Sequence, residues 1–289
     1  MVGKCALCQQ EKELQLSHII PKFVGNYLKS TAVGNIRNQE APNRVIQDIE
    51  KHELLCHDCE ELFSAAERYF ANTIFYPYLR DKLTEFSYSD QLFYFITSLS
   101  WRSLYLDIIN FVRGDDIRID VLERMIEAEG KMRRYLLHES SDIGSIENHI
   151  FFYDVVTRVS NSNDSLKEPN LLVHRALHSY SGYSENTIYT ISNLMGIIIV
   201  TLYSKDSDEE WLNTQIWNSS GIIKAEKQNI RSRLGGEFQY WEESLEKSRE
   251  KMTNATKEKI EKTIADIGED IVQYAIYQDI VDDAKIIRE

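Results

Sequence analysis

The sequence predicts an α+β protein in which a small head, residues 1–80, precedes a larger helical and mixed α/β body, residues 81–289. All four cysteines of the 289-residue chain lie in the first 59 residues, which sets the head apart in composition. Beyond residue 60 helical periodicity comes first, and strand-like runs appear only after about residue 148. A hydrophobic content of 43% is enough to build buried cores in both parts.

The cysteines form two pairs with the same spacing, Cys5-x2-Cys8 and Cys56-x2-Cys59. Two such pairs are typical of a site in which paired thiolates on turns bind one tetrahedral Zn²⁺. Four sulfur ligands leave no open position for a substrate, so this zinc would be structural and would hold together a segment too small and polar to fold alone. Two redox dithiols, or four unrelated thiols, are the alternatives.

The segment between the two pairs contains the stretch "LQLSHIIPKF", residues 14–23. We expect residues 14–21 to be extended, with Pro21 ending regular pairing, and His18 lies inside this strand-like piece. A short helix is expected over residues 23–29, and "GNIRNQEAPN", residues 34–43, has the composition of a loop. After the second pair, residues 59–79 predict a helix with a repeating apolar face made of Leu62, Ala66, Tyr69, Phe70 and Ile74.

The formal net charge of −13 argues against a chain that coats nucleic acid along its whole surface. The charge is uneven, because residues 1–46 hold six basic side chains against three acidic ones. An anionic ligand is therefore expected to meet the head rather than the body.

The body is predicted to contain two helices, residues 89–112 and 118–139, followed by strands at 149–156, 194–203 and 214–226. The last of these is interpreted as a hairpin that turns at "NSSG", residues 218–221, and residues 160–170 as a loop. A long charged helical tail, residues 241–287, is expected to be exposed or to form oligomers. The longest apolar run, residues 195–203, is too short to cross a bilayer, and the first residues do not resemble a signal peptide, so we expect a soluble, cytoplasmic protein with no membrane partner.

The order "CALC", "SHIIPK", "APNR" and "LLCHDC", within about the first quarter of the chain, resembles the HNH endonucleases, whose ββα-metal core is stapled by zinc. The resemblance implies metal-dependent hydrolysis of phosphodiester bonds, in DNA in preference to RNA. By the same resemblance His18 is the general base and Asn43 orients it. Lys22 and Arg44 would bind the phosphates that flank the cut.

This chain departs from the family pattern at three positions. Ser17 stands where a metal-ligating residue usually precedes the base, and Glu60 stands where a second histidine usually follows the last cysteine. Glu60 can replace that histidine as a ligand of a catalytic Mg²⁺ or Mn²⁺, because a carboxylate is a hard ligand. The asparagine is displaced as well, since Lys51 occupies its usual place, and this leaves His52 or His57 as other polar contributors.

Several readings without catalysis remain open. A histidine beside two isoleucines is often a hydrogen-bonded core residue, His57 fits a solvated turn, and Glu60 is favoured near a helix N-terminus by the macrodipole alone. The main rival to a nuclease is a zinc-binding interaction module with a degenerate site, and a redox or metal sensor is a third class. The acidic body has no Walker, Rossmann or G-x-S-x-G motif, and we expect it to sense a signal, to bind a regulatory partner or to form a homo-oligomer, a layout similar to bacterial or phage-defence effectors.

Overall fold

The computed structural model describes residues 1–114, 117–153 and 166–286. It is a mixed α+β structure, as the sequence predicts, and four cysteines in it lie close enough to hold a zinc ion. The predicted loop at 160–170 and the end of the predicted strand at 149–156 fall largely outside the described residues. None of the described helices combines the length and the apolar character that crossing a membrane requires.

The head is built on a three-stranded antiparallel sheet, β1-β2-β3, formed by Val2–Lys4, Glu11–His18 and Lys51–Cys56. Helix α1, Lys22–Thr31, and a long loop connect β2 to β3. Helix α2, His57–Phe70, begins directly after Cys56 and buries one face, made of Cys59, Phe63, Ala66 and Phe70. The helix predicted after the second cysteine pair is confirmed, but its predicted face is only partly right, because Leu62 is exposed and Phe63 is buried. The helical path continues through a π-helical turn, Ala71–Phe75, and the short α3, Tyr76–Leu79.

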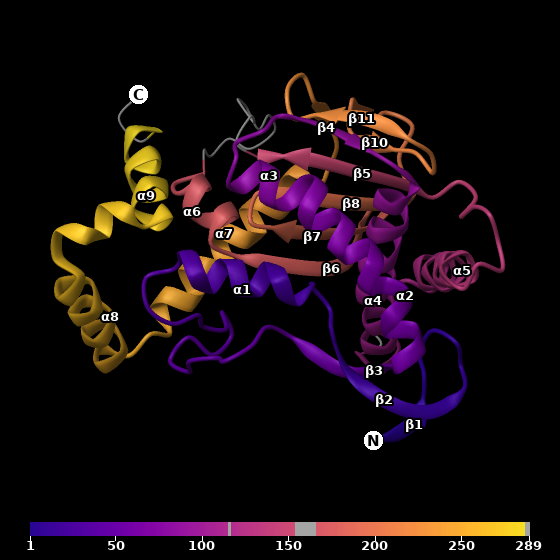
Figure 1. Ribbon diagram of the computed structural model, residues 1–289, viewed down its shortest axis with the longest axis horizontal. Helices are drawn as coiled ribbons and strands as arrows, with labels where there is room; N and C mark the ends of the chain where they lie inside the picture. Colours follow the sequence, from indigo (N-terminus) through magenta and orange to yellow (C-terminus); the bar gives the residue numbers. More distant parts are fainter. Residues whose placement is uncertain (115–116, 154–165, 287–289) are drawn as a thin grey trace.

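The body contains a five-stranded antiparallel sheet in the order β10-β5-β8-β7-β6. These strands are Gln215–Ile216, Glu147–Phe152, Ile197–Ser204, Thr187–Leu194 and Leu177–Ser184. Helix α4, Asp90–Gly114, packs on one face and is covered by α5, Ile119–Leu136, while α6, Pro169–His174, and α7, Gly235–Glu250, cover the other face (Figure 1). Alternate residues of β8 join the two cores, which explains why its sequence is apolar without interruption.

One hydrophobic cluster extends from the head into the body. Phe70 of α2 stacks on Phe95 of α4, with ring centroids 4.1 Å apart, and Phe63 contacts Trp101 edge to face. The same cluster includes residues of β3 and of β5, and Leu14 of β2 packs against it. Side chains from both parts of the chain fill this common core. The division into two domains at residue 80 therefore stays a prediction.

Three details of the predicted secondary structure are wrong. The run from 194 to 203 is not one strand: Met195 and Gly196 have φ of 60° and 93° and form the turn between β7 and β8. The segment around "NSSG" is not a hairpin, because β10 pairs with β5, whereas β11, Gly221–Lys224, pairs with β4, Glu85–Tyr88.

The third correction concerns the C-terminal tail. Instead of one long helix it contains α7, then α8, Asn254–Ile267, a 3-10 turn, Gly268–Gln273, and α9, Ala275–Ile286. The Thr253 hydroxyl accepts a hydrogen bond from the N–H of Thr256 and so begins α8, and Gly268, with φ of 60°, ends it. Helix α8 projects from the body in Figure 1, and Thr256 is its one buried residue. A short pair of strands, β9, Glu210–Leu212, and β12, Asn229–Arg231, completes the described elements.

Candidate functional site

The four cysteines converge on one point of the head. Cys5 and Cys8 lie in the turn between β1 and β2, Cys56 ends β3, and Cys59 lies in the first turn of α2. Their sulfur atoms are all within 4.8 Å of one another, and none is in a disulfide. The cluster could hold a metal ion such as zinc, and no other group of three or more metal-binding side chains occurs among the described residues.

The turn that carries the first pair is fixed by its own backbone. The N–H of Gln9, which has φ of 61°, donates to Cys5 O, and the N–H of Ala6 donates to Leu54 O of β3. The N–H of Cys56 points at Cys5 Sγ from 3.3 Å. A hydrogen bond from Cys59 and backbone donors such as the N–H of Cys56 lower the pKa of Cys5 below its ordinary value, which favours the thiolate that binds metal. A metal-binding geometry is therefore present in the polypeptide itself.

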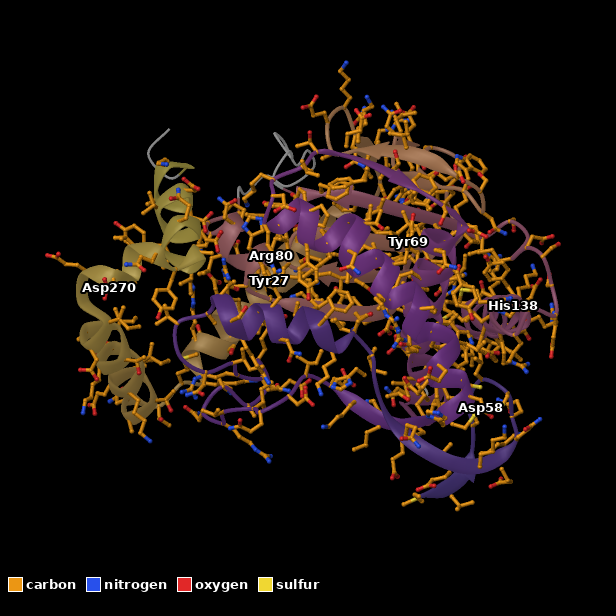
Figure 2. The ribbon with its side chains drawn as sticks, viewed as in Figure 1. Tyr27, Asp58, Tyr69, Arg80, His138 and Asp270 are labelled. Atoms are coloured by element: carbon orange, nitrogen blue, oxygen red, sulfur yellow. The ribbon has the colours of Figure 1, made fainter. Side chains whose placement is uncertain are left out.

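The N-terminal turn of α2 is also tied to the sheet by charge. Lys12 Nζ of β2 lies 2.8 Å from Asp58 Oδ2, and this lysine lowers the pKa of Asp58. Figure 2 shows Asp58 at the end of the helix nearest the strands of the head. Asp58 is exposed and Lys12 is only half-buried, so the pair orients more than it stabilises.

His18 ends β2 with its side chain 16% exposed. Its Nε2 lies 3.1 Å from Asp48 Oδ2, and Lys51 Nζ approaches the same oxygen to 2.9 Å. Hydrogen bonds from Lys51 and then His18 hold the pKa of Asp48 well below its usual range, so Asp48 is ionised and favours a proton on Nε2. No hydrogen bond to Nδ1 occurs in the part of the chain that the structure describes, which leaves that nitrogen as a free acceptor.

The backbone of His18 is held by a buried arginine. Arg102 of α4 is 1% exposed, donates from Nη1 to His18 O at 2.8 Å, and donates from Nη2 to Glu67 Oε1 at 2.8 Å. One guanidinium therefore joins the end of β2 to α2 and α4. Because a buried charge is costly unless it is paired, this contact fixes where His18 can lie.

Ser17 has a structural role in this arrangement. It is 1% exposed, and its Oγ accepts a hydrogen bond from the N–H of Leu55 at 3.2 Å, beside a register shift between Gln15 and Leu16. At this register shift the Ser17 hydroxyl lies within the sheet. The Ser17 side chain is thus occupied within the β2–β3 pair.

Glu60 lies in the first turn of α2, and its Oε1 is buried with no hydrogen-bond partner among the described residues. A buried carboxylate oxygen without a partner is costly and suits a cation ligand. Glu60 is not part of the cysteine cluster, and no described contact joins it to His18.

The other residues singled out in the sequence lie apart from His18 or at the surface. Asn43 donates from Nδ2 to Lys251 O, and its Oδ1 accepts from the N–H and the hydroxyl of Thr253, so it joins the long loop to the α7–α8 junction. No hydrogen bond connects Asn43 with His18. His52 pairs with Glu50 at 2.7 Å, and the remaining three side chains are exposed: Lys22, Arg44 and His57.

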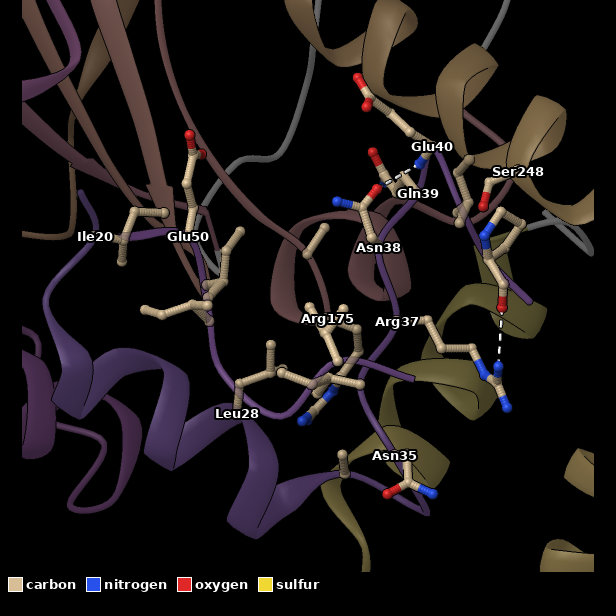
Figure 3. Close-up of a pocket in the computed structure, with 18 of the residues that line it drawn as sticks. Ile20, Leu28, Asn35, Arg37, Asn38, Gln39, Glu40, Glu50, Arg175 and Ser248 are labelled. Carbon is tan, nitrogen blue, oxygen red and sulfur yellow. Dashed lines mark hydrogen bonds between the residues drawn. The ribbon is translucent and has the colours of Figure 1, made fainter. Parts of the chain in front are cut away.

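Sequence reasoning missed Asp48 and Arg102. Asp48 sits in the loop segment "VIQDIEKH", which carries no motif. Arg102 was detectable in principle, because a single charge inside the apolar stretch "SLSWRSLYL" requires a buried partner. Asp48 and Lys51 also line a cavity of about 860 Å³ between the long loop and the body, which Glu50 and Arg175 also line (Figure 3).

Comparisons with known proteins do not identify a family for this chain. A scan against protein-family models finds no match, and searches of the curated proteins and of the solved structures find no significantly similar protein.

Proposed function

We propose that the chain is a metal-dependent, HNH-like endonuclease that hydrolyses phosphodiester bonds in DNA. The observation that carries the proposal is the pairing of His18 with Asp48 at the end of β2. The order of β2, β3 and α2 around four clustered cysteines supports it further, because the resemblance to the HNH family rests on the same order.

In this proposal His18 takes a proton from the attacking water. With Nε2 bonded to an ionised carboxylate, Nδ1 is the basic nitrogen, and histidine is suited to proton transfer near neutral pH. Arg102 keeps the backbone of His18 in place, and Asp48 keeps the ring in one tautomer. Both are positioning residues.

The resident Zn²⁺ of this proposal is structural and is bound by Cys5, Cys8, Cys56 and Cys59. Glu60 would hold the catalytic Mg²⁺ or Mn²⁺, which supplies positive charge to the phosphate oxygens and the leaving oxygen when bound. Lys22 at the start of α1 and Arg44 in the long loop are exposed and could contact phosphates on either side of the cut. DNA is preferred over RNA by analogy with the family.

The second candidate is a catalytically degenerate module that binds nucleic acid or protein. One observation favours it: the Ser17 hydroxyl accepts a backbone hydrogen bond within the sheet, at the position where the family has a metal ligand. The acidic body then would serve recognition alone. In either case we propose a cytoplasmic bacterial or phage-defence effector whose body binds a regulatory partner or a second copy.

Plasmid DNA with Mg²⁺ or Mn²⁺ separates the two candidates. We expect wild-type protein to nick or linearise the plasmid, and His18→Ala to cleave it at least 100-fold more slowly. His52→Ala should cleave at the wild-type rate, since His52 is an exposed histidine on the neighbouring strand. No cleavage by wild type with either metal, together with plasmid binding, supports the degenerate module.

A further inference from the structure

Strand β6 forms a free edge of the body sheet. In the sheet order β10-β5-β8-β7-β6 it pairs with β7 alone, over eight residues and without a register shift. Its sequence, "LHSYSGYS", contains no charged residue and no proline. Edge strands are normally protected by lysine, proline, bulges or shortness, and β6 has none of these, whereas the opposite edge, β10, is only two residues long.

The unpaired backbone groups of β6 can be identified from one hydrogen bond. The N–H of Ser181 donates to Asp107 Oδ2 of α4 at 2.6 Å, so it points away from β7. Backbone groups alternate in direction along an antiparallel strand, and residues of the same parity therefore also point outward: Leu177, Ser179 and Tyr183. These three N–H groups donate no hydrogen bond to any other described segment.

This edge borders a groove between the body and the head. Two cavities, of about 860 and 550 Å³, share the same three lining residues, Ile19 and Glu50 of the head and Ser179 of β6. Leu177 also lines the larger cavity, and Tyr180 and residues of α4 line the smaller one. The free edge thus forms one wall of the groove, and the head forms the other.

We propose that an extended segment of a partner protein binds in this groove and adds a strand to β6. Its main-chain amides would pair with the outward groups of Leu177 and Ser179, which is how sheet edges commonly recognise peptides. Aliphatic side chains of Ile19, Leu54 and Leu106 line the groove, so alternate residues of the segment would be apolar.

The two walls of the groove argue for a single extended segment as the occupant. A second copy of the chain carries its own β6 between its own head and body, so two such edges cannot meet without moving both heads. Asp107 marks the end of the free edge, because it already occupies the N–H of Ser181. A bound segment would contact Ile19, which directly follows His18, and Glu50, which lies close after Asp48 in the same loop.

A phage-displayed library of linear heptapeptides, selected on full-length wild type and counter-selected on Ser179→Pro, tests the proposal. Ser179 lies opposite Ser192 of β7, but its N–H points outward, so proline removes that donor without removing a hydrogen bond to β7. Ser179→Ala is the matched control that keeps the N–H. We expect selected synthetic peptides to bind wild type and Ser179→Ala within twofold of each other and Ser179→Pro at least tenfold more weakly. Hydrogen exchange across residues 177–184 should slow when the peptide binds.

N-methylation of the selected peptide gives a second test on wild-type protein alone, independent of how well Ser179→Pro folds. Two versions of the peptide are compared, one methylated at the odd-numbered amides and one at the even-numbered amides. One version should lose binding and the other should keep it, because only one edge of the peptide faces β6. Failure to select any peptide, equal binding to Ser179→Pro, or loss in both parities overturns the proposal. A dimer of wild type that Ser179→Pro dissociates would instead place a second copy on the edge.

Discussion

His18 and Asp48 are 30 residues apart in sequence, yet Nε2 of His18 lies 3.1 Å from Oδ2 of Asp48. The long loop between α1 and β3 brings the carboxylate to the end of β2, and Lys51 holds it there from 2.9 Å. This arrangement fixes Nε2 of His18, while Nδ1 has no hydrogen-bond partner among the residues that the structure describes. It is the feature of the head that most directly suggests a proton-transfer site.

Asp48→Asn tests whether this carboxylate positions His18. If the chain cuts DNA, we expect kcat to fall about 10–100-fold with little change in KM, because the substrate contacts are unchanged while the ring loses its ionised partner. Glu50→Gln is the control, since Glu50 makes a similar contact with the exposed His52. Equal losses in both variants would show that the effect is a general one of surface charge.

Arg102→Met should destabilise the protein by about 3–5 kcal/mol, measured by urea unfolding. The substitution leaves Glu67 without its buried partner and leaves His18 O without its donor. The double variant Arg102→Met, Glu67→Gln should recover part of the loss. Arg118→Met, which breaks the half-exposed pair with Asp120, should leave stability nearly unchanged, because the ions of such a pair are screened by water.

Asn43→Ala should loosen the junction between α7 and α8 and, if the chain cuts DNA, should leave the cleavage rate unchanged. The substitution removes hydrogen bonds to Lys251 and Thr253, so we expect trypsin to cut after Lys251 several-fold faster and stability to fall by about 1 kcal/mol. Asn38→Ala is the control, because Asn38 bonds within the same loop to Glu40. A loss of cleavage with unchanged proteolysis would contradict this role and would return Asn43 to the orientation of His18.

His178 should make stability depend on pH. It stacks on Trp241 with ring centroids 4.6 Å apart, its Nε2 is buried without a partner among the described residues, and burial lowers its pKa to about 4. The unfolded chain, in which histidine has a pKa of about 6.5, binds the proton first, so stability is full above about pH 6.5 and falls as the pH approaches 4. Below both pKa values of His178, the free energy of unfolding is lower by about 3 kcal/mol.

The measurement is chemical unfolding from pH 8 to pH 4 with His178→Phe, which keeps the aromatic stack. The variant should lose most of this part of the pH dependence. His138→Asn is the control, because His138 is an exposed histidine that stacks on Tyr94 and is visible at the edge of the molecule in Figure 2. An identical pH profile for wild type and His178→Phe would contradict the account.

The sequence predicted those features of the head that depend on local pattern. The spacing of the cysteines and the periodicity that follows Cys59 are local, so the metal-binding cluster and α2 could be read directly. The contact of His18 with Asp48 could not, because it depends on how a loop without pattern folds back. The same is true of Asn43, whose partners lie more than 200 residues away.

In the body, strand pairing was the feature that sequence reasoning missed. Gly221 was interpreted as a turn residue, but its lack of a side chain makes room for the ring of Tyr88, whose hydroxyl lies 2.5 Å from where a Cβ would be. It therefore begins β11 opposite β4 instead of closing a hairpin. Which strands pair is decided by tertiary packing, and single-sequence patterns carry little information about it.

X-ray absorption at the zinc edge of the purified protein tests the central claim most directly, because every proposal about the head depends on the four cysteines binding one ion. The account predicts one zinc per chain with four sulfur ligands at about 2.3 Å, and loss of that signal in Cys8→Ser. A metal-free protein that keeps its fold, or a zinc bound by nitrogen or oxygen in place of two or more sulfurs, would contradict it.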